Sequence, residues 1–317
     1  MKDLDSLYAA IDALSLEGGW HRKTPSLWPE PRKNFLPYLW RYAQVKPILE
    51  AAGHLVDHAM ADRRNLTMTN PVPGNLYATA RTMVAAYQSI RPGECALAHR
   101  HTPNALRIIL EGHGCYTTVN GTRVEMRPGD VLLTPSWNWH AHESVGTDEC
   151  FWVDVLDVPL VHLLEPMFFE RHPDQLESEI HNVTECPLAC RWEDSLRRLD
   201  SAPLQTGAMA EHEVELGTPT PALKTMAVHA QRLSAGCVTP VHQSTANAIF
   251  TVIEGSGTTV VDGQALDWQR GDVFVVPAWR THQHRVSERT HLIRVSDEPV
   301  MQAFDFLFKQ NTPASAP

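Results

Sequence analysis

Residues 93–107 have the sequence GECALAHRHTPNALR, and a similar stretch begins at Gly236. GECALAHRH from Gly93 matches GCVTPVHQS from Gly236, and NALRIILEGHG matches NAIFTVIEGSG at the same spacing. RPGDVLLTPSWNWHAH from Arg127 matches QRGDVFVVPAWRTHQH from Gln269, where the spacing is one residue shorter, and we place this loss in the intervening hairpin turn. Self-similarity at a nearly fixed spacing predicts two copies of one structural module.

Both copies consist of short β-prone runs separated by turns. NALRIIL, CYTTV and CFWVDVLDVP are rich in β-branched and aromatic residues, and Asn120-Gly121 between two such runs is a hairpin signal. Many short strands with this rhythm predict a sandwich or barrel, so the expected fold class is mainly β. We predict a first module at residues 71–160 and a second module at residues 226–300.

The other segments lack this β pattern. Apolar residues at three-to-four spacing within residues 1–70 predict an N-terminal arm that is helical and, where prolines interrupt it, irregular. Residues 161–225 are predicted to form a helical connector between the modules, and residues 301–317 a C-terminal tail.

Composition and charge exclude several classes of protein. The formal net charge is −10 at pH 7, which argues against nucleic acid or an anionic membrane as the main partner. The N-terminus has no apolar signal region, and no apolar run approaches the ~20 residues of a membrane span. The six cysteines are scattered, so we expect reduced thiols and a cytoplasmic protein.

Three histidines of the first copy form a metal-ligand pattern. His99 and His101 point to one face of a strand because side chains alternate along it, and His140 follows on a later strand. A single histidine in such a place is more often an ordinary buried residue. Three histidines inside a repeated motif favour metal ligands.

These motifs resemble the two conserved motifs of the cupin superfamily. The positions that match them are Gly93, His99, His101, Gly129, Pro135 and His140. The resemblance implies a bicupin, with two jelly-roll β-barrel modules. One motif residue is missing, because the place of the usual glutamate falls on Ala105 or Leu106.

The missing glutamate has a chemical consequence. Three neutral imidazoles leave a divalent ion its full charge and, in octahedral geometry, up to three open positions. A dianionic acid with adjacent carboxylate and phenolate groups would fill two of these positions, and O₂ the third. Activation of O₂ requires a redox-active metal, so we expect one Fe(II) per chain, in the first module.

Longer stretches are similar to the gentisate 1,2-dioxygenase family, which includes salicylate and 1-hydroxy-2-naphthoate dioxygenases. The resemblance is carried by ADRRNLTMTNPVPG, AAYQSIRPGECALAHRHTPNALRIILEGHGCYTTVNG, MRPGDVLLTPSWNWHAH and FWVDVLDVP. It implies an Fe(II)-dependent dioxygenase that uses O₂ to open an aromatic acid between its carboxyl- and hydroxyl-bearing carbons. It also implies a homo-oligomer, expected to be a tetramer.

The resemblance assigns roles to residues at matching positions. It makes the three histidines the iron ligands and Arg107 the partner of the substrate carboxylate, a role that suits a bidentate guanidinium. The catalytic residues that it implies are His142, Arg107 and Asp154. The substrate-binding residues that it implies are Arg107, Gln88, Arg63, Val84 and His142.

Each of these assignments has a simpler alternative. Arg63 could form a salt bridge on a helix face, Gln88 could satisfy backbone groups, and Asp154 could be structural support. His142 recurs in the second copy as His284, so it could belong to the fold. Arg107 lies in an apolar run, where a buried charge is costly without a partner, and this favours a functional role.

Two departures from the family pattern bear on the substrate. Ala141 stands where relatives often have an aspartate, and Val84 stands where some have a large aromatic residue. A small residue at position 84 leaves room for a ring substituent. The expected substrate is therefore gentisate or a related 5-substituted salicylate. The alternatives are a non-gentisate substrate (5-nitro-, 5-amino- or 5-halosalicylate, salicylate or 1-hydroxy-2-naphthoate) and a non-enzymatic bicupin that binds a small ligand.

The second copy keeps the turns of the motif but not its chemistry. It has Ser244 where the first copy has His101, and Phe250 where the first has Arg107. The motif residues that it retains are Gly236, His242, Gly271, Pro277 and His282. Two histidines are a poor iron site, so we predict that this module is free of metal or only weakly occupied.

Overall fold

The computed structural model describes residues 2–21, 25–56, 63–205, 208–217 and 223–312. Internal contacts divide the chain into two units, residues 1–32 and residues 33–317. In the first unit, helix α1 (Leu4–Ala13) begins at a capping box in which the Asp3 carboxylate accepts the backbone N–H of Ser6 at 2.8 Å. No residue of α1 is buried.

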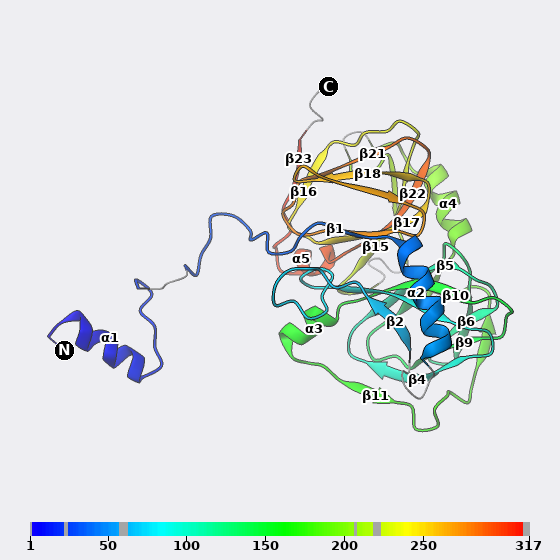
Figure 1. The fold of residues 1–317 in the computed structure, drawn as a ribbon, viewed down its shortest axis with the longest axis horizontal. Helices are drawn as coiled ribbons and strands as arrows, with labels where there is room; N and C mark the ends of the chain where they lie inside the picture. The colour runs from blue at the N-terminus through cyan, green and yellow to red at the C-terminus, as the bar shows by residue number, and fades with distance from the viewer. Residues whose placement is uncertain (1, 22–24, 57–62, 206–207, 218–222, 313–317) are drawn as a thin grey trace. The chain divides into compact units, whose positions relative to one another are not determined.

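The second unit begins with a module of two six-stranded sheets (Figure 1). The strands of one sheet, in spatial order, are β13 (Ala189–Cys190), β8 (Val131–Thr134), β5 (Ala105–Glu111), β10 (Cys150–Leu156), β3 (Val84–Ile90) and β2 (Arg64–Thr67). The other sheet consists of β11 (Phe169–Arg171), β4 (Cys95–His101), β9 (His140–Ser144), β6 (Cys115–Val119), β7 (Thr122–Met126) and β12 (His181–Val183).

The second module repeats this arrangement. Its first sheet consists of β1 (Tyr38–Trp40), β20 (Val273–Val276), β17 (Ala248–Glu254), β22 (Thr290–Ser296), β15 (Ala227–Leu233) and β14 (His212–Glu215). Its other sheet consists of β19 (Gln264–Gln269), β18 (Ser256–Val261), β21 (His282–Val286), β16 (Val241–Ser244) and β23 (Lys309–Thr312). The prediction of a mainly β fold with two jelly-roll modules is confirmed.

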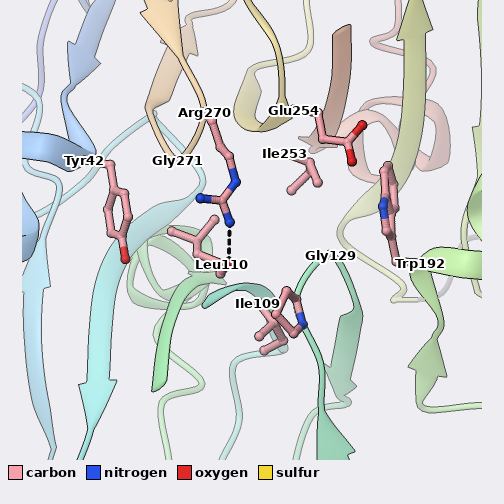
Figure 2. Close-up of a pocket in the computed structure, with 10 residues that line it drawn as sticks. Tyr42, Ile109, Leu110, Gly129, Trp192, Ile253, Glu254, Arg270 and Gly271 are labelled. Carbon is pink, nitrogen blue, oxygen red and sulfur yellow. Dashed lines mark hydrogen bonds between the residues drawn. The ribbon is translucent and has the colours of Figure 1, made fainter. Parts of the chain in front are cut away.

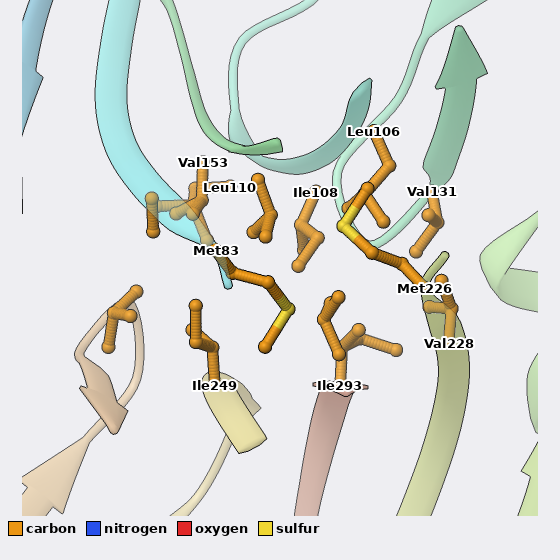
Figure 3. Packing of buried hydrophobic residues seen from close by; sticks show 14 of the residues in the cluster. Met83, Leu106, Ile108, Leu110, Val131, Val153, Met226, Val228, Ile249 and Ile293 are labelled. Atoms are coloured by element: carbon orange, nitrogen blue, oxygen red, sulfur yellow. The ribbon is translucent and has the colours of Figure 1, made fainter. Parts of the chain in front are cut away.

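The main hydrophobic core lies between the two modules. It joins the outer faces of β3, β5, β8 and β10 to those of β15, β17, β20 and β22. Figure 3 shows Met83 and Ile108 of the first module packed close to Met226 and Ile293 of the second. Met83 and Met226 are both fully buried and occupy equivalent positions in the two copies. Because alternate residues of a strand face opposite sides, the inner faces of these sheets are left to line the two barrels.

Each module is completed by a segment that precedes the other one. Strand β1 comes before the first module in sequence but pairs with β20 of the second. Strand β13 comes before the second module but pairs with β8 of the first. Helices follow both strands: α2 (Tyr42–Leu55) after β1, and α4 (Trp192–Ser201) after β13. We call this arrangement the reciprocal exchange.

Equivalent aspartates anchor the first residues of α2 and α4, although each helix packs against its own module, α2 against β2 and β3 and α4 against β14 and β15. Asp272 of the second module accepts the backbone N–H of Tyr42 at 2.8 Å, and Asp130 of the first accepts that of Trp192 at 2.9 Å. Both aspartates belong to the repeated glycine-aspartate turn of the motif. This turn therefore holds the N-terminus of a helix from the other half of the chain, which the repeat in the sequence did not predict.

A second pair of contacts crosses between the modules in the same reciprocal way. Thr82, which precedes β3, donates its hydroxyl to Asp297 of the second module at 2.5 Å. Thr225 occupies the equivalent position before β15 and donates to Asp157 of the first module. These contacts, one buried and one partly buried, tie the start of each barrel to the end of the other.

Segments outside the repeated motifs add further elements. Helix α3 (Val158–Leu164) and strands β11, β12 and β13 lie within the predicted connector, and α5 (Glu298–Ala303) follows β22. The strand β23 lies within the predicted C-terminal tail and pairs with β16. Part of the N-terminal helical prediction, residues 57–62, lies outside the described residues. The exact boundaries of the five predicted segments stay a prediction.

Two details of the sequence analysis are wrong. Cys115 on β6 and Cys150 on β10 form a buried disulfide, so the expectation that all six cysteines are reduced fails for this pair. Both copies also keep the hairpin turn, at Asn120-Gly121 and Asp262-Gly263 with positive φ at every residue. The spacing of these two turns is already the shorter one, so the lost residue lies before the turn, between β17 and the turn of the second copy.

Candidate metal centre

The three predicted ligand histidines meet at the centre of the first barrel. His99 and His101 lie on β4, and His140 lies on β9 directly opposite His99. One nitrogen from each ring can be chosen so that all three lie within 4.8 Å of one another. Because β4 is extended at this point, the alternation of side chains brings both of its histidines to the same face.

Two of these histidines are oriented by backbone carbonyls. His101 Nδ1 lies 2.8 Å from the Pro103 carbonyl oxygen, and His140 Nδ1 lies 3.1 Å from that of Asn138. A carbonyl only accepts, so each Nδ1 carries the proton and Nε2 keeps its lone pair for a metal. Burial lowers the pKa of His101 to about 4 and that of His140 well below its ordinary value. Both rings are therefore neutral at pH 7, which is the form that binds a metal ion.

His99 has a different partner. Its Nδ1 lies 2.6 Å from Nη1 of Arg63, which follows the segment 57–62 and precedes β2. A guanidinium only donates, so Nδ1 of His99 accepts this hydrogen bond. Burial, followed by the nearby charge of Arg63, lowers the pKa of His99 to about 2. The three neutral imidazoles fit a divalent metal ion, but Arg63 favours the His99 tautomer that keeps the proton on Nε2.

Arg107 lies on β5 beside this cluster and is buried together with an acidic partner. Its Nε is 3.4 Å from Oδ1 of Asp154 on β10, and its Nη1 donates to the Thr134 hydroxyl at 2.6 Å. Strand register places Arg107 directly opposite Asp154. Burial lowers the pKa of Arg107 and raises that of Asp154, while each partner's charge opposes the shift in the other. Asp154 is therefore the partner that a buried charge at Arg107 requires.

Gln88 and Val84 lie on the same inner face of this sheet. Both are on β3, where register places Gln88 opposite Trp152 and Val84 opposite Leu156. Both side chains are buried, Gln88 at 4% and Val84 at 8% exposure. The structure thus gathers every predicted pocket residue around the first barrel, although it gives no contact between Gln88 or Val84 and the histidines.

His142 lies behind the cluster and differs from its counterpart in the second module. Its ring centroid is 6.1 Å from that of His140, and its buried Nδ1 has no hydrogen-bond partner among the described residues. His284 of the second module instead places its Nδ1 2.8 Å from the Thr259 hydroxyl. Burial lowers the pKa of His142 well below its ordinary value, so its ring is neutral at pH 7.

Two polar residues around Arg107 were not predicted from the sequence. Thr134 on β8 accepts the hydrogen bond from Arg107, and Trp152 on β10 donates its indole N–H to Oδ2 of Asp154 at 2.9 Å. Trp152 lies two residues before Asp154 on the same strand, so period-two alternation was the signal that could have placed it beside the site.

The second barrel has a different centre. The rings of His242 and His282 lie 5.9 Å apart, and Phe250 packs against His284 with a centroid distance of 5.2 Å. At the position of Asp154 stands Arg294, paired with Glu298 at 2.7 Å. Within the described part of the chain, the only group of three metal-ligating side chains is the one in the first barrel. That the second module holds no metal stays a prediction.

A separate pocket lies between the modules, away from the histidines (Figure 2). Tyr42 and Trp192 stand on opposite sides of it. Each lies over a motif glycine, Gly271 and Gly129 respectively, where any side chain would collide with the ring. Arg270 reaches into the middle and donates to the Leu110 carbonyl at 3.1 Å. This pocket is a product of the reciprocal exchange, and the described residues that line it hold no metal-ligating cluster.

Comparison with known proteins agrees with this fold. Residues 86–156 and 230–295 both match the family described as Cupin domain. The chain is 34% identical to a 5-aminosalicylate 1,2-dioxygenase of Comamonas sp, covering 99% of this chain and 92% of that protein. It is 35% identical to a gentisate 1,2-dioxygenase of Streptomyces sp, covering 95% and 94%.

A solved structure with the same architecture is that of a salicylate 1,2-dioxygenase from Pseudaminobacter salicylatoxidans. It superposes with a TM-score of 0.89 at 28% identity and covers 98% of this chain and 97% of that one. Together with the two cupin barrels, these relatives make the chain a ring-cleaving dioxygenase of the bicupin type. The chain belongs to the gentisate 1,2-dioxygenase family. Among the described residues, no helix is long and apolar enough to cross a membrane.

Proposed function

We propose that this protein is an Fe(II)-dependent dioxygenase that opens gentisate or a related 5-substituted salicylate between its carboxyl- and hydroxyl-bearing carbons. The observation that carries this proposal is the neutral histidine triad, which has no carboxylate ligand and lies next to the buried Arg107–Asp154 pair. A site with no ligand carboxylate suits a dianionic substrate, and a buried guanidinium suits its carboxyl group.

The proposal gives each residue one task. His99, His101 and His140 would hold one iron per chain, and the iron would supply chelation of the substrate and activation of O₂. Arg107 binds and orients the substrate carboxylate, and Asp154 holds Arg107. Gln88 and Arg63 contact the substrate from the pocket wall. The unpartnered Nδ1 of His142 takes up and returns a proton near the substrate hydroxyl.

The small side chain at position 84 supports a substrate with a ring substituent. Val84 lies on the inner face of β3 and is small. The relatives' names divide between gentisate and 5-aminosalicylate at nearly equal identity, 35% and 34%. We therefore propose a 5-substituted salicylate as the substrate class, with 5-amino-, 5-nitro- and 5-halosalicylate, salicylate and 1-hydroxy-2-naphthoate as alternatives to gentisate.

An oxygen-uptake panel tests this function. Protein loaded anaerobically with Fe(II) is mixed with each of these acids, and O₂ consumption is followed together with the absorbance of a ring-opened product. We expect one O₂ consumed per substrate, and activity that a chelator removes and Fe(II) restores. Binding of the acids without O₂ uptake by any iron-loaded sample would favour the non-enzymatic ligand-binding alternative.

We also propose a homotetramer that works in the cytoplasm. Exposed apolar side chains in the first unit, Leu4 and Leu14 at 63% and 71% exposure, favour contact with another copy. Four of the six cysteines are free thiols, which suits a reducing compartment, and the one disulfide, Cys115–Cys150, is buried. Light scattering of the purified protein tests the first statement, and fractionation of the native cells tests the second.

A further inference from the structure

The guanidinium of Arg107 is held on two sides. Thr134 accepts a hydrogen bond from its Nη1 at 2.6 Å, and Asp154 Oδ1 lies 3.4 Å from its Nε in an ion pair in which Nε makes no hydrogen bond. The arginine is 3% exposed, and no hydrogen bond joins its Nη2 to another described residue. One hydrogen bond and one ion pair therefore hold the guanidinium and leave Nη2 available to a ligand.

Asp154 is itself fixed by a second partner. Its Oδ1 faces Arg107, and its Oδ2 accepts the indole N–H of Trp152 at 2.9 Å. Trp152 is fully buried, and its ring centroid lies 5.7 Å from that of His142. Without the indole N–H, one oxygen of a buried carboxylate would lose its partner, and the carboxylate would be free to rotate away from Arg107.

The second module is an internal control for these contacts. At the positions of Arg107, Thr134, Trp152 and Asp154 it has Phe250, Val276, Leu292 and Arg294. All four polar groups have changed together, although these four residues are as buried as those of the first module.

Buried polar residues that serve the fold are retained instead. Asn104 donates its backbone N–H to Asp157 at 2.8 Å, and the equivalent Asn247 does the same to Asp297 at 2.7 Å. A role of Thr134 and Trp152 in the barrel itself would have kept them in both modules as well. Because the second module lacks all three residues, we link the roles of Thr134 and Trp152 to Arg107.

We propose that Thr134 and Trp152 are positioning residues that orient Arg107 toward the substrate carboxylate. Thr134 fixes the guanidinium directly, and Trp152 fixes it through Asp154. This inference rests on the proposed function, because it assumes that Arg107 binds an aromatic acid. It adds two residues whose effect is specific for ligands that carry a carboxylate.

The Thr134→Val variant tests the direct contact. Valine keeps the shape of threonine and is the residue that the second module has at this position. Loss of a hydrogen bond to a charged group predicts a KM for the preferred acid about ten- to a hundredfold higher, with a smaller change in kcat. Thr134→Ser restores the hydroxyl and is expected to bring KM back to near the wild-type value.

The Trp152→Phe variant tests the indirect contact, and the second module supplies matched controls. Thr259 and Trp268 are buried there, and the Trp268 indole N–H donates to the Thr259 hydroxyl at 2.8 Å. Thr259→Val and Trp268→Phe therefore remove equally buried hydrogen bonds far from Arg107. Both are expected to lower the unfolding midpoint and leave KM unchanged.

Anaerobic calorimetry separates positioning from general damage. Iron-loaded variants are titrated with the preferred acid and with catechol, which chelates through two hydroxyls and has no carboxylate. Thr134→Val and Trp152→Phe should weaken binding of the acid and leave binding of catechol unchanged. Equal losses for both ligands, or a KM within twofold of wild type for Thr134→Val, would overturn the inference. Wild-type protein without oxygen uptake would instead overturn the proposed function.

Discussion

Arg63 Nη1 donates a hydrogen bond to Nδ1 of His99 at 2.6 Å, so an arginine faces one ring of the candidate metal centre. The other two rings of the triad present the same nitrogen to carbonyl oxygens. Metal ligation through Nε2 favours a proton on Nδ1, which a carbonyl accepts and a guanidinium repels. The site thus contains one contact that competes with the metal.

Replacing Arg63 should strengthen metal binding. In Arg63→Gln, the amide oxygen can accept from Nδ1–H of His99, and a positive charge leaves the site. We expect affinity for Fe(II) or Co(II) to rise about tenfold, in the range seen when groups behind a metal ligand are changed. The measurement is an anaerobic competition titration with a chelator. Arg127→Gln, which removes an exposed partner of Glu125, is the control. An unchanged metal affinity in Arg63→Gln would show that the hydrogen bond from Arg63 to His99 does not oppose metal binding.

The triad is expected to be essential, and its counterpart in the second module dispensable. His101→Ala removes a ligand that no neighbouring carboxylate can replace, so iron content should fall below one tenth per chain and oxygen uptake should vanish. His242→Ala in the second barrel should keep one iron per chain and full activity. Iron analysis and an oxygen electrode measure both. Full activity in His101→Ala would refute the assignment of the triad.

Val84 is expected to limit the size of the substrate. The Val84→Phe variant places a larger side chain on the inner face of β3, opposite Leu156. We predict that kcat/KM falls at least tenfold more for 5-nitrosalicylate than for unsubstituted salicylate, because overfilling a packed pocket is costly. Steady-state oxygen uptake on both substrates gives this ratio. A ratio of the two kcat/KM values equal to that of the wild type would contradict the placement of Val84 in the pocket wall.

The disulfide should contribute to stability rather than to chemistry. It joins β6 and β10, and its cysteines are 35 residues apart. Closing a loop of this length predicts that Cys150→Ala lowers the free energy of unfolding by about 2–4 kcal/mol. Urea unfolding of the variant measures this, with Cys237→Ala, a free thiol in the second module, as the control. A Cys150→Ala protein as stable as the control would mean that the bond does not form in solution.

Acid should destabilise the fold through buried neutral histidines. Burial lowers the pKa of His229 to about 4, while the ordinary value of 6.5 applies in the unfolded chain. The unfolded chain therefore binds a proton that the folded chain refuses, and stability falls as pH drops from about 6.5 to about 4. His229→Gln should flatten the melting temperature across this interval and change it little above pH 7. Parallel curves for both proteins would show that His229 titrates normally when folded.

The histidine triad could be predicted because its signals are local. His99 and His101 are two residues apart on one strand, and the spacing of each motif recurs in the second copy. The partners of Arg107 were only half predictable. Asp154 came from the family resemblance, whereas Thr134 reaches Arg107 through the pairing of β5 with β8, which no local pattern specifies.

The remaining surprises come from contacts that are distant in sequence. The number and spacing of the six cysteines do not predict which two form a disulfide. Cys115 and Cys150 come together only because their sheets face each other. Strand β1 could not be assigned to the second module, because its partner β20 lies towards the opposite end of the chain. Pairing of this kind is decided by packing between modules rather than by the residues of the strand itself.

The reciprocal exchange also determines what counts as a complete unit in this protein. A fragment ending after β10 would carry β1 without the edge of β20 that receives it, and would expose the edge of β8 that β13 covers. A fragment holding only the second barrel would have the opposite defects. Neither half is therefore a self-sufficient body. The single chain has the organisation of an obligate dimer whose two partners each lend the other a strand, and the half that holds the histidine triad depends on the half that lacks it.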